Sequence, residues 1–212
     1  MDYKSTPSML AATDAIVLSL QPYSDKAHIL HAYTRTGGRV NYKVYGLGRK
    51  HPIGIYMPLS LIRITADYPS NGLPTIREAV SQRSGLSAEG GLYKQTVALF
   101  IAEVLSHVLR HPMPDEPMFD FIAQAVQELD QTDEPQNFHL VFMVNFAAKL
   151  GFAIPEESSI TNLSPSLREK VGIGLSRKER QDTLHALCDY FAEHVETWQQ
   201  PRSLDVLIEV FN

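Results

Sequence analysis

Short apolar and β-branched stretches separated by turn residues, one of them with a clean period of two, predict β-strands through most of the first 80 residues. The alternation is clearest where Val40, Tyr42 and Val44 share one side and the residues between them share the other. That other side carries Arg39, Asn41, Lys43 and Tyr45, so it is expected to face solvent. The stretches that predict strands are 15–20, 27–34, 39–45, 57–68 and 75–80, with turns at 22–25 and 37–38.

Beyond residue 91 the apolar period changes to 3.6, which predicts helices over 92–111, 115–131, 138–150, 176–198 and 203–211. Ser176 and Glu179 have the spacing of a capping box at the start of the fourth of these helices. Residues 152–175 have no clear pattern. We therefore expect an α+β protein with a five-stranded antiparallel OB-fold barrel at residues 1–82 and an all-helical domain at residues 83–212.

Charge is distributed unevenly between these two predicted domains. The chain carries a net charge of −5, yet residues 1–80 hold nine Lys or Arg against five Asp or Glu, a net charge of +4. The remainder is net −9. This segregation predicts a polyanionic partner for the first part of the chain alone.

The basic residues cluster around the third predicted strand. Arg39, Asn41, Lys43 and Tyr45 recur every second residue, about 6.6 to 7 Å apart along a strand, which is close to the backbone spacing of an extended nucleic-acid strand. Lysine and arginine can then follow phosphates while a tyrosine stacks on a base. The competing interpretation is a solvated edge strand protected from strand pairing by its charges. The predicted DNA-binding set is Lys26, Arg35, Arg39, Lys43, Tyr45, Arg49 and Lys50.

No motif in the sequence predicts catalysis, so the protein is not expected to be an enzyme or to need a cofactor. The glycines of Gly46-Leu-Gly-Arg-Lys50 lack the spacing of a phosphate-binding loop. Ser87 misses the nucleophile-elbow pattern by one residue. His107 and His111 have metal-ligand spacing, but no carboxylate lies between them and a helix-end role is favoured.

The composition is that of a globular protein, with 44% hydrophobic and 20% charged residues. No stretch of about 18 apolar residues could span a bilayer and the N-terminus does not resemble a signal peptide, so a soluble cytoplasmic protein is expected. Cys188, the single cysteine, lies in the apolar register of a helix and is expected to be buried.

Several segments, taken in order, resemble the bacterial recombination mediator family RecO. They are Pro22-Tyr-Ser-Asp25, Tyr33-Thr-Arg-Thr-Gly-Gly-Arg-Val40, Lys43-Val-Tyr-Gly-Leu-Gly-Arg-Lys50, Phe146-Ala-Ala-Lys-Leu-Gly-Phe152 and Arg202-Ser-Leu-Asp-Val-Leu-Ile-Glu-Val-Phe211. The resemblance spans most of the chain. It implies a DNA-binding protein that binds single- and double-stranded DNA, anneals complementary strands, contacts the single-strand-binding protein SSB, and acts with RecR in loading RecA in the nucleoid.

Two features depart from the family pattern. Some members carry a four-cysteine zinc site after the position of Leu150 to Phe152, but residues 153–175 of this chain contain no cysteine and are short for the family. No zinc is therefore expected. In relatives the acidic tail of SSB docks on the helical domain, where this chain offers Lys149, Arg177, Lys178 and Arg180 without a motif to choose among them.

The alternative function is a protein-interaction scaffold that recognises acidic tails without binding DNA. A third and weaker alternative is a hydrolase whose catalytic residues cannot be paired from the sequence.

Overall fold

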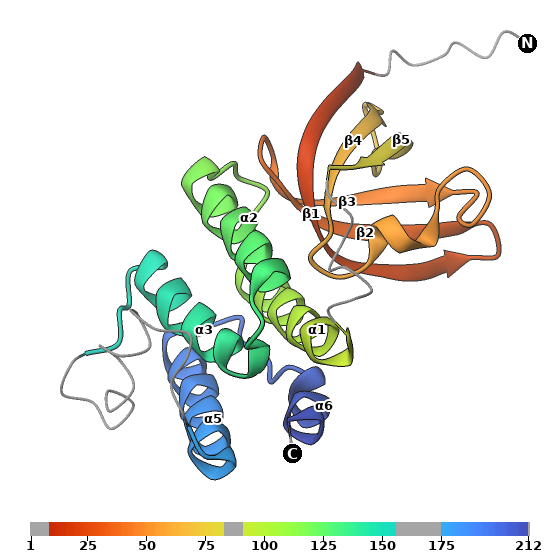
Figure 1. Ribbon diagram of the computed structural model, residues 1–212. Helices are drawn as coiled ribbons and strands as arrows, with labels where there is room; N and C mark the ends of the chain where they lie inside the picture. Colours follow the sequence, from red (N-terminus) through yellow and green to blue (C-terminus); the bar gives the residue numbers. More distant parts are fainter. Residues whose placement is uncertain (1–8, 83–90, 156–174, 212) are drawn as a thin grey trace, which may run out of the picture. The chain divides into compact units, whose positions relative to one another are not determined.

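The computed structural model describes residues 9–82, 91–155 and 175–211. Its first part is built from five strands (Figure 1). The strands are β1 (Met9–Ser24), β2 (Ala27–Thr34), β3 (Gly38–Tyr45), β4 (Leu61–Tyr68) and β5 (Thr75–Ser81). A short 3-10 helix, η1 (Ile53–Tyr56), lies between β3 and β4.

The five strands close into a barrel in the order β1-β2-β3-β5-β4. The pairings of β1 with β2, β1 with β4, β2 with β3, and β4 with β5 are antiparallel. The fifth pairing, between β3 and β5, is parallel and joins Lys43 to Thr75. The five-stranded sheet followed by helices confirms the predicted α+β class and agrees with an OB-fold, although the prediction of purely antiparallel pairing misses this one contact.

Strand β1 is much longer than the predicted stretch of residues 15–20. Its first half pairs with β4, from Met9 opposite Tyr68 to Ile16 opposite Leu61, and its second half pairs with β2. The strand continues through Pro22, which pairs with His28, and the ladder shifts register between Pro22 and Ser24. The predicted turn at 22–25 is therefore wrong, and the chain reverses at residues 25–26. Strand β4, in contrast, is shorter than the predicted strand at 57–68, because it begins at Leu61.

The barrel interior is filled by the inward positions of every strand, as the alternating pattern predicts. Leu30, Tyr42, Ile62 and Ile64 are fully buried at the centre of this cluster. The Tyr42 hydroxyl is satisfied by the Tyr68 hydroxyl at 2.8 Å, which is the condition for burying a phenol in an apolar core.

Contacts divide the chain into two compact units, each made of two segments that are not consecutive in the sequence. The barrel unit contains residues 1–87 together with 109–124, and the helical unit contains 88–108 together with 125–212. The predicted domains, 1–82 and 83–212, are continuous, and their boundary stays a prediction. The segment Leu109–Gln124, named the strap below, therefore folds with the barrel although it follows the first helix.

The helices are close to their predicted positions. They are α1 (Gly91–Val108), α2 (Glu116–Gln131), α3 (Phe138–Lys149), α5 (Arg177–His194) and α6 (Ser203–Val210), with the short η3 (Pro135–Asn137) before α3. The capping box is confirmed, since Ser176 accepts from the Glu179 amide and Glu179 from the Ser176 amide. Gly151 ends α3 with a φ of 92°, a conformation that glycine adopts at no steric cost.

The helical unit has its own apolar core. Phe146 stacks on Phe191, which in turn contacts Trp198, and all three come from positions that the helical period marks as apolar. Cys188 is buried as predicted, and burial, with a smaller contribution from Asp189, raises its pKa to about 12. Tyr93, in the first turn of α1, is 51% exposed and contacts Phe211.

Within the described ranges, no helix is long and apolar enough to cross a membrane. The segment where family members carry zinc, 153–175, lies largely outside those ranges. Elsewhere in the described chain, no three His, Cys, Asp or Glu side chains gather as a metal site would require. The absence of zinc stays a prediction.

Candidate nucleic-acid interface

The outer face of β2 and β3 carries most of the predicted DNA-binding residues. Because Tyr42 and Val44 point into the core, Lys43 and Tyr45 point outward, as predicted. Their cross-strand partners are Ile29 and Ala27 on β2. This is the surface on which OB-folds hold oligonucleotides, together with the loops between strands 1 and 2 and between strands 4 and 5.

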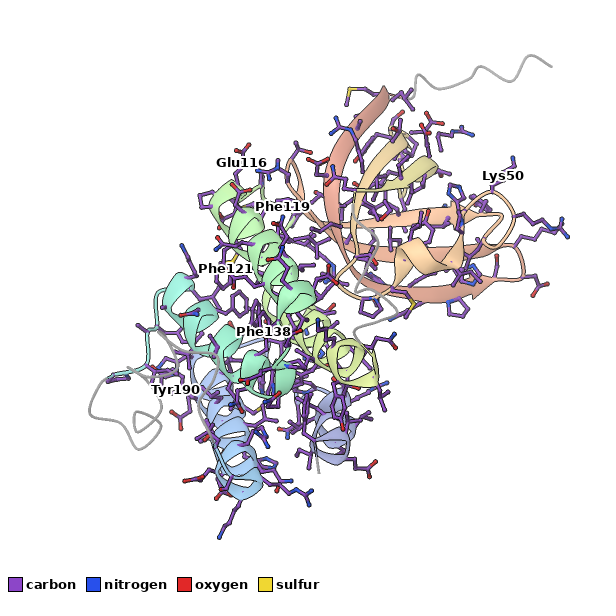
Figure 2. The ribbon with its side chains drawn as sticks, viewed as in Figure 1. Lys50, Glu116, Phe119, Phe121, Phe138 and Tyr190 are labelled. Atoms are coloured by element: carbon purple, nitrogen blue, oxygen red, sulfur yellow. The ribbon has the colours of Figure 1, made fainter. Side chains whose placement is uncertain are left out.

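One end of this face gathers five of the seven predicted residues. Ala27 pairs with Tyr45, so Lys26 in the β1–β2 turn lies beside the start of the loop that carries Arg49 and Lys50. Lys43 is half-buried and the others are exposed. We name this surface the basic pole, made of Lys26, Lys43, Tyr45, Arg49 and Lys50. Figure 2 shows Lys50 at the tip of the loop.

The loop after β3 holds its two basic residues in a defined turn. The carbonyl of Gly46 accepts hydrogen bonds from the amides of Arg49 at 3.1 Å and Lys50 at 2.9 Å. Gly46 and Gly48 have φ values of 73° and 80°, which explains glycine at both positions. The two glycines thus shape a turn for consecutive cations, although their spacing excludes a phosphate-binding loop.

Beneath this loop a buried histidine anchors the chain. His51 is 4% exposed and its Nδ1 lies 3.1 Å from the Tyr56 hydroxyl of η1. Burial, followed by the positive charge of Lys50, lowers the His51 pKa, so the ring is neutral at neutral pH. The anchor is therefore uncharged and the positive charge of the loop lies on its surface.

Tyr23 also contributes to this end of the barrel, although it was not among the residues predicted from the sequence. Tyr23 sits where the β1–β2 ladder shifts register between Pro22 and Ser24, and it is 66% exposed. An exposed tyrosine in a bulge offers a flat apolar surface near the β1–β2 turn. The signal available in the sequence was the proline before it, which was interpreted as part of a turn.

At the opposite end of the face, the strap covers the barrel. Tyr33 points outward but is 3% exposed, because it stacks against Phe119 of α2 with ring centroids 6.4 Å apart. Burial, and secondly Asp115, raise the Tyr33 pKa to about 12. A side chain on Gly38 would lie 2.1 Å from the carbonyl oxygen of Met113, so the strap requires glycine there.

Arg35 is held by the strap and does not belong to the basic pole. Its guanidinium lies 2.6 Å from the Asp120 carboxylate and 4.5 Å from the centre of the Phe119 ring. These contacts order the side chain against α2. In Figure 2, Phe119 and Lys50 lie at opposite ends of the barrel unit.

Arg39 is half-buried beside the strap, where its backbone amide donates to the His111 carbonyl at 3.1 Å. Burial, and secondly the nearby positive charge of Arg110, lower the pKa of the Arg39 guanidinium to about 10. Arg39 therefore remains a cation at neutral pH. Between Arg39 and the basic pole, Asn41 bonds to His31 at 2.7 Å across the two strands.

The helical unit contains two adjoining cavities that share Arg177 and Phe211. The larger, of about 350 Å³, is lined by Tyr93, Asp133, Pro135, Gln136, Arg177, Val210 and Phe211. The smaller, of about 10 Å³, is lined by His139, Arg177, Arg180, Gln181, Leu184, Leu207, Ile208 and Phe211. Within the described residues, the buried Nδ1 of His139 has no hydrogen-bond partner. Burial, and secondly Arg180, lower its pKa to about 3.

Two family models match consecutive parts of the chain. The model described as Recombination protein O N terminal matches residues 9–84, and the model described as Recombination protein O C terminal matches residues 90–162. A protein named DNA repair protein RecO from Phocaeicola vulgatus is 31% identical, over 96% of this chain and 100% of the relative. The chain belongs to the RecO family. RecO proteins from Flavobacterium johnsoniae and Porphyromonas gingivalis are 28% and 26% identical over the same shares.

The alignment with the RecO protein of Phocaeicola vulgatus runs over 241 positions, more than the 212 residues of this chain. Part of that relative therefore has no counterpart here, in agreement with a chain that is short for the RecO family. The basic pole and the strap both fall within the parts matched by the two RecO models.

Proposed function

We propose that this RecO family member acts as a recombination mediator in DNA repair and binds single- and double-stranded DNA through the basic pole. The observation that carries the proposal is a set of four cations, three exposed and one half-buried, at one end of an OB-type barrel face. Among the described residues, no carboxylate forms an ion pair with Lys26, Lys43, Arg49 or Lys50. Their charge is therefore available to phosphates.

The exposed tyrosines extend the proposal to single strands. Tyr45 is 46% exposed beside Lys43, and Tyr23 is 66% exposed near the β1–β2 turn. Stacking on such rings is worth about 1–3 kcal/mol per base and tolerates any sequence. If the basic pole holds the phosphates and the bases stack loosely on the tyrosine rings, the base-pairing edges of the strand stay accessible. This arrangement supports annealing of complementary strands. Membership of the RecO family supports a proposed role in loading RecA onto SSB-coated DNA.

The test is binding of a fluorescent oligo-dT across a salt series, followed by annealing of complementary oligonucleotides coated with SSB. If the four cations of the basic pole each contact one phosphate, the logarithm of affinity falls with the logarithm of salt with a slope of about −2.8. Annealing is expected to accelerate. Absence of binding at low salt would leave the scaffold function; binding without faster annealing would remove annealing from the proposal.

The cavities of the helical unit support a proposed site for the acidic, apolar tail of SSB. Arg177 borders both cavities and supplies a positive charge at their junction. Val210 and Phe211 supply apolar surface, while Asp133 is the acidic residue on the lining. A carboxylate could pair with Arg177 while an apolar side chain enters between the aromatic rings. RecR is proposed as a second partner, with no surface assigned.

Exchange of Arg177 for glutamate is expected to weaken binding of the C-terminal SSB peptide about tenfold, through loss of one charge-assisted hydrogen bond. Fluorescence anisotropy with a labelled peptide measures the effect. Lys178→Glu is the matched control, because Lys178 is the next residue of α5 and lines neither cavity. Equal loss in both variants would show that general charge, and not this cavity, attracts the peptide.

A further inference from the structure

The strap places Arg110, a basic residue from outside the five strands, beside the barrel face. Arg110 immediately precedes His111, whose carbonyl oxygen accepts a hydrogen bond from the Arg39 amide at 3.1 Å. This hydrogen bond sets the strap alongside the Gly38 end of β3. Arg110 is exposed and Arg39 is half-buried. Two guanidinium-bearing residues, distant in sequence, therefore lie together at the edge of the OB-type face.

Two guanidinium groups from different segments concentrate positive charge at one point of this face. Burial, and secondly the charge of Arg110, lower the pKa of Arg39, in agreement with the closeness of the two residues. Guanidinium groups bind phosphate oxygens through paired hydrogen bonds, and they do so best where water is partly excluded. Arg39, half-buried beside the strap, and the exposed Arg110 meet this description.

We propose that Arg39 and Arg110 together hold one phosphate of a bound single strand, which extends the DNA path from the basic pole along β3 to the strap. This inference rests on the proposed function and adds a residue from outside the barrel sequence to that site. Tyr45 and Arg39 are six residues apart on β3, about 20 Å at the usual strand rise, or about three nucleotides of an extended strand.

The charges around this point define where the path ends. Lys43 lies on the same outward face between Arg39 and Tyr45. Beyond Arg39 the strap carries Asp115, Glu116 and Asp120, of which Asp120 is held by Arg35. These carboxylates repel a phosphate backbone. The strand is therefore expected to leave the surface at Arg110.

The test compares Arg110→Ala with Arg63→Ala for oligo-dT binding across a salt series. Arg63 is the control, because it is an exposed arginine of the same unit on β4, which pairs with neither β2 nor β3, and its guanidinium is already paired with Asp14 at 3.0 Å. Loss of one phosphate contact is expected to make the salt slope shallower by about 0.7 and to lower affinity about eightfold at 50 mM salt. Arg63→Ala should leave both unchanged.

Three outcomes are distinguishable. A shallower slope for Arg110→Ala alone supports the inference. Wild-type slope in Arg110→Ala overturns it, whether or not affinity falls, because a structural role of Arg110 would alter affinity together with the melting temperature and leave the number of phosphate contacts unchanged. If the wild-type protein itself fails to bind, the proposed function is lost and the inference with it.

Discussion

Charge reversal of Lys43 and Arg49 together is expected to weaken oligo-dT binding by more than about 60-fold at 50 mM salt. Each phosphate contact on a single strand contributes about eightfold at that salt concentration, and a glutamate adds repulsion to the lost attraction. Both residues belong to the basic pole, one on β3 and the other in the loop after it. The salt slope should become shallower by about 1.4.

The matched control is Lys149→Glu/Lys178→Glu, which changes the net charge equally but places the new carboxylates on α3 and α5 of the helical unit. This variant should bind oligo-dT with nearly wild-type affinity and an unchanged slope. If both double variants weaken binding to the same extent, net charge governs the affinity and the basic pole is not the contact surface. Circular dichroism before the titration checks that each variant is folded.

The second large effect is expected in the acid stability of the helical unit. His139 is 1% exposed between Phe100 and Phe211, and its pKa is lowered to about 3. In the unfolded chain its pKa is that of an ordinary histidine, about 6.5. Between these values the unfolded state binds a proton that the folded state does not. Stability is therefore lost as pH falls from 6.5 toward 3, by about 1.4 kcal/mol per pH unit.

Urea unfolding of the wild-type protein and of His139→Leu between pH 7 and pH 4.5 measures this contribution. Burial alone would raise the pKa of Glu103, but hydrogen bonds from Ser203 and Arg202 together lower it, so such carboxylates also affect the acid limb in both proteins. The difference between the proteins isolates His139. It is expected to change by about 2.7 kcal/mol over the two pH units below 6.5. Parallel curves would mean that His139 takes up a proton in the folded state.

Most strands and helices could be predicted from the sequence because burial repeats with a clear period. The exception is the first half of β1, where Met9 to Thr13 show little alternation. This stretch becomes a strand through pairing with β4, some 50 residues later in the chain. Tertiary pairing of this kind leaves no local signal. The parallel contact between β3 and β5 was missed for the same reason.

The candidate site could be predicted in part. The outward positions of Lys43 and Tyr45 follow from alternation within one strand, and the structure places them as expected. The surroundings of Arg35 and Arg39 do not follow from the barrel sequence, because Phe119, Asp120 and Arg110 reach them from the strap. The exposure of a side chain depends on what packs over it, and the strap, which covers Arg35 and Arg39, begins more than 60 residues after them in the chain.

The membership of the strap in the barrel unit bears on how this protein can be divided. The chain passes from one unit to the other at three places, since 88–108 belong to the helical unit while 1–87 and 109–124 belong to the barrel unit. A cut at residue 82 would strip the barrel of its strap and leave the aromatic ring of Tyr33 uncovered. Exchange of barrels between homologues therefore requires residues 109–124 to be inherited together with residues 1–87, although α1 separates them in the chain.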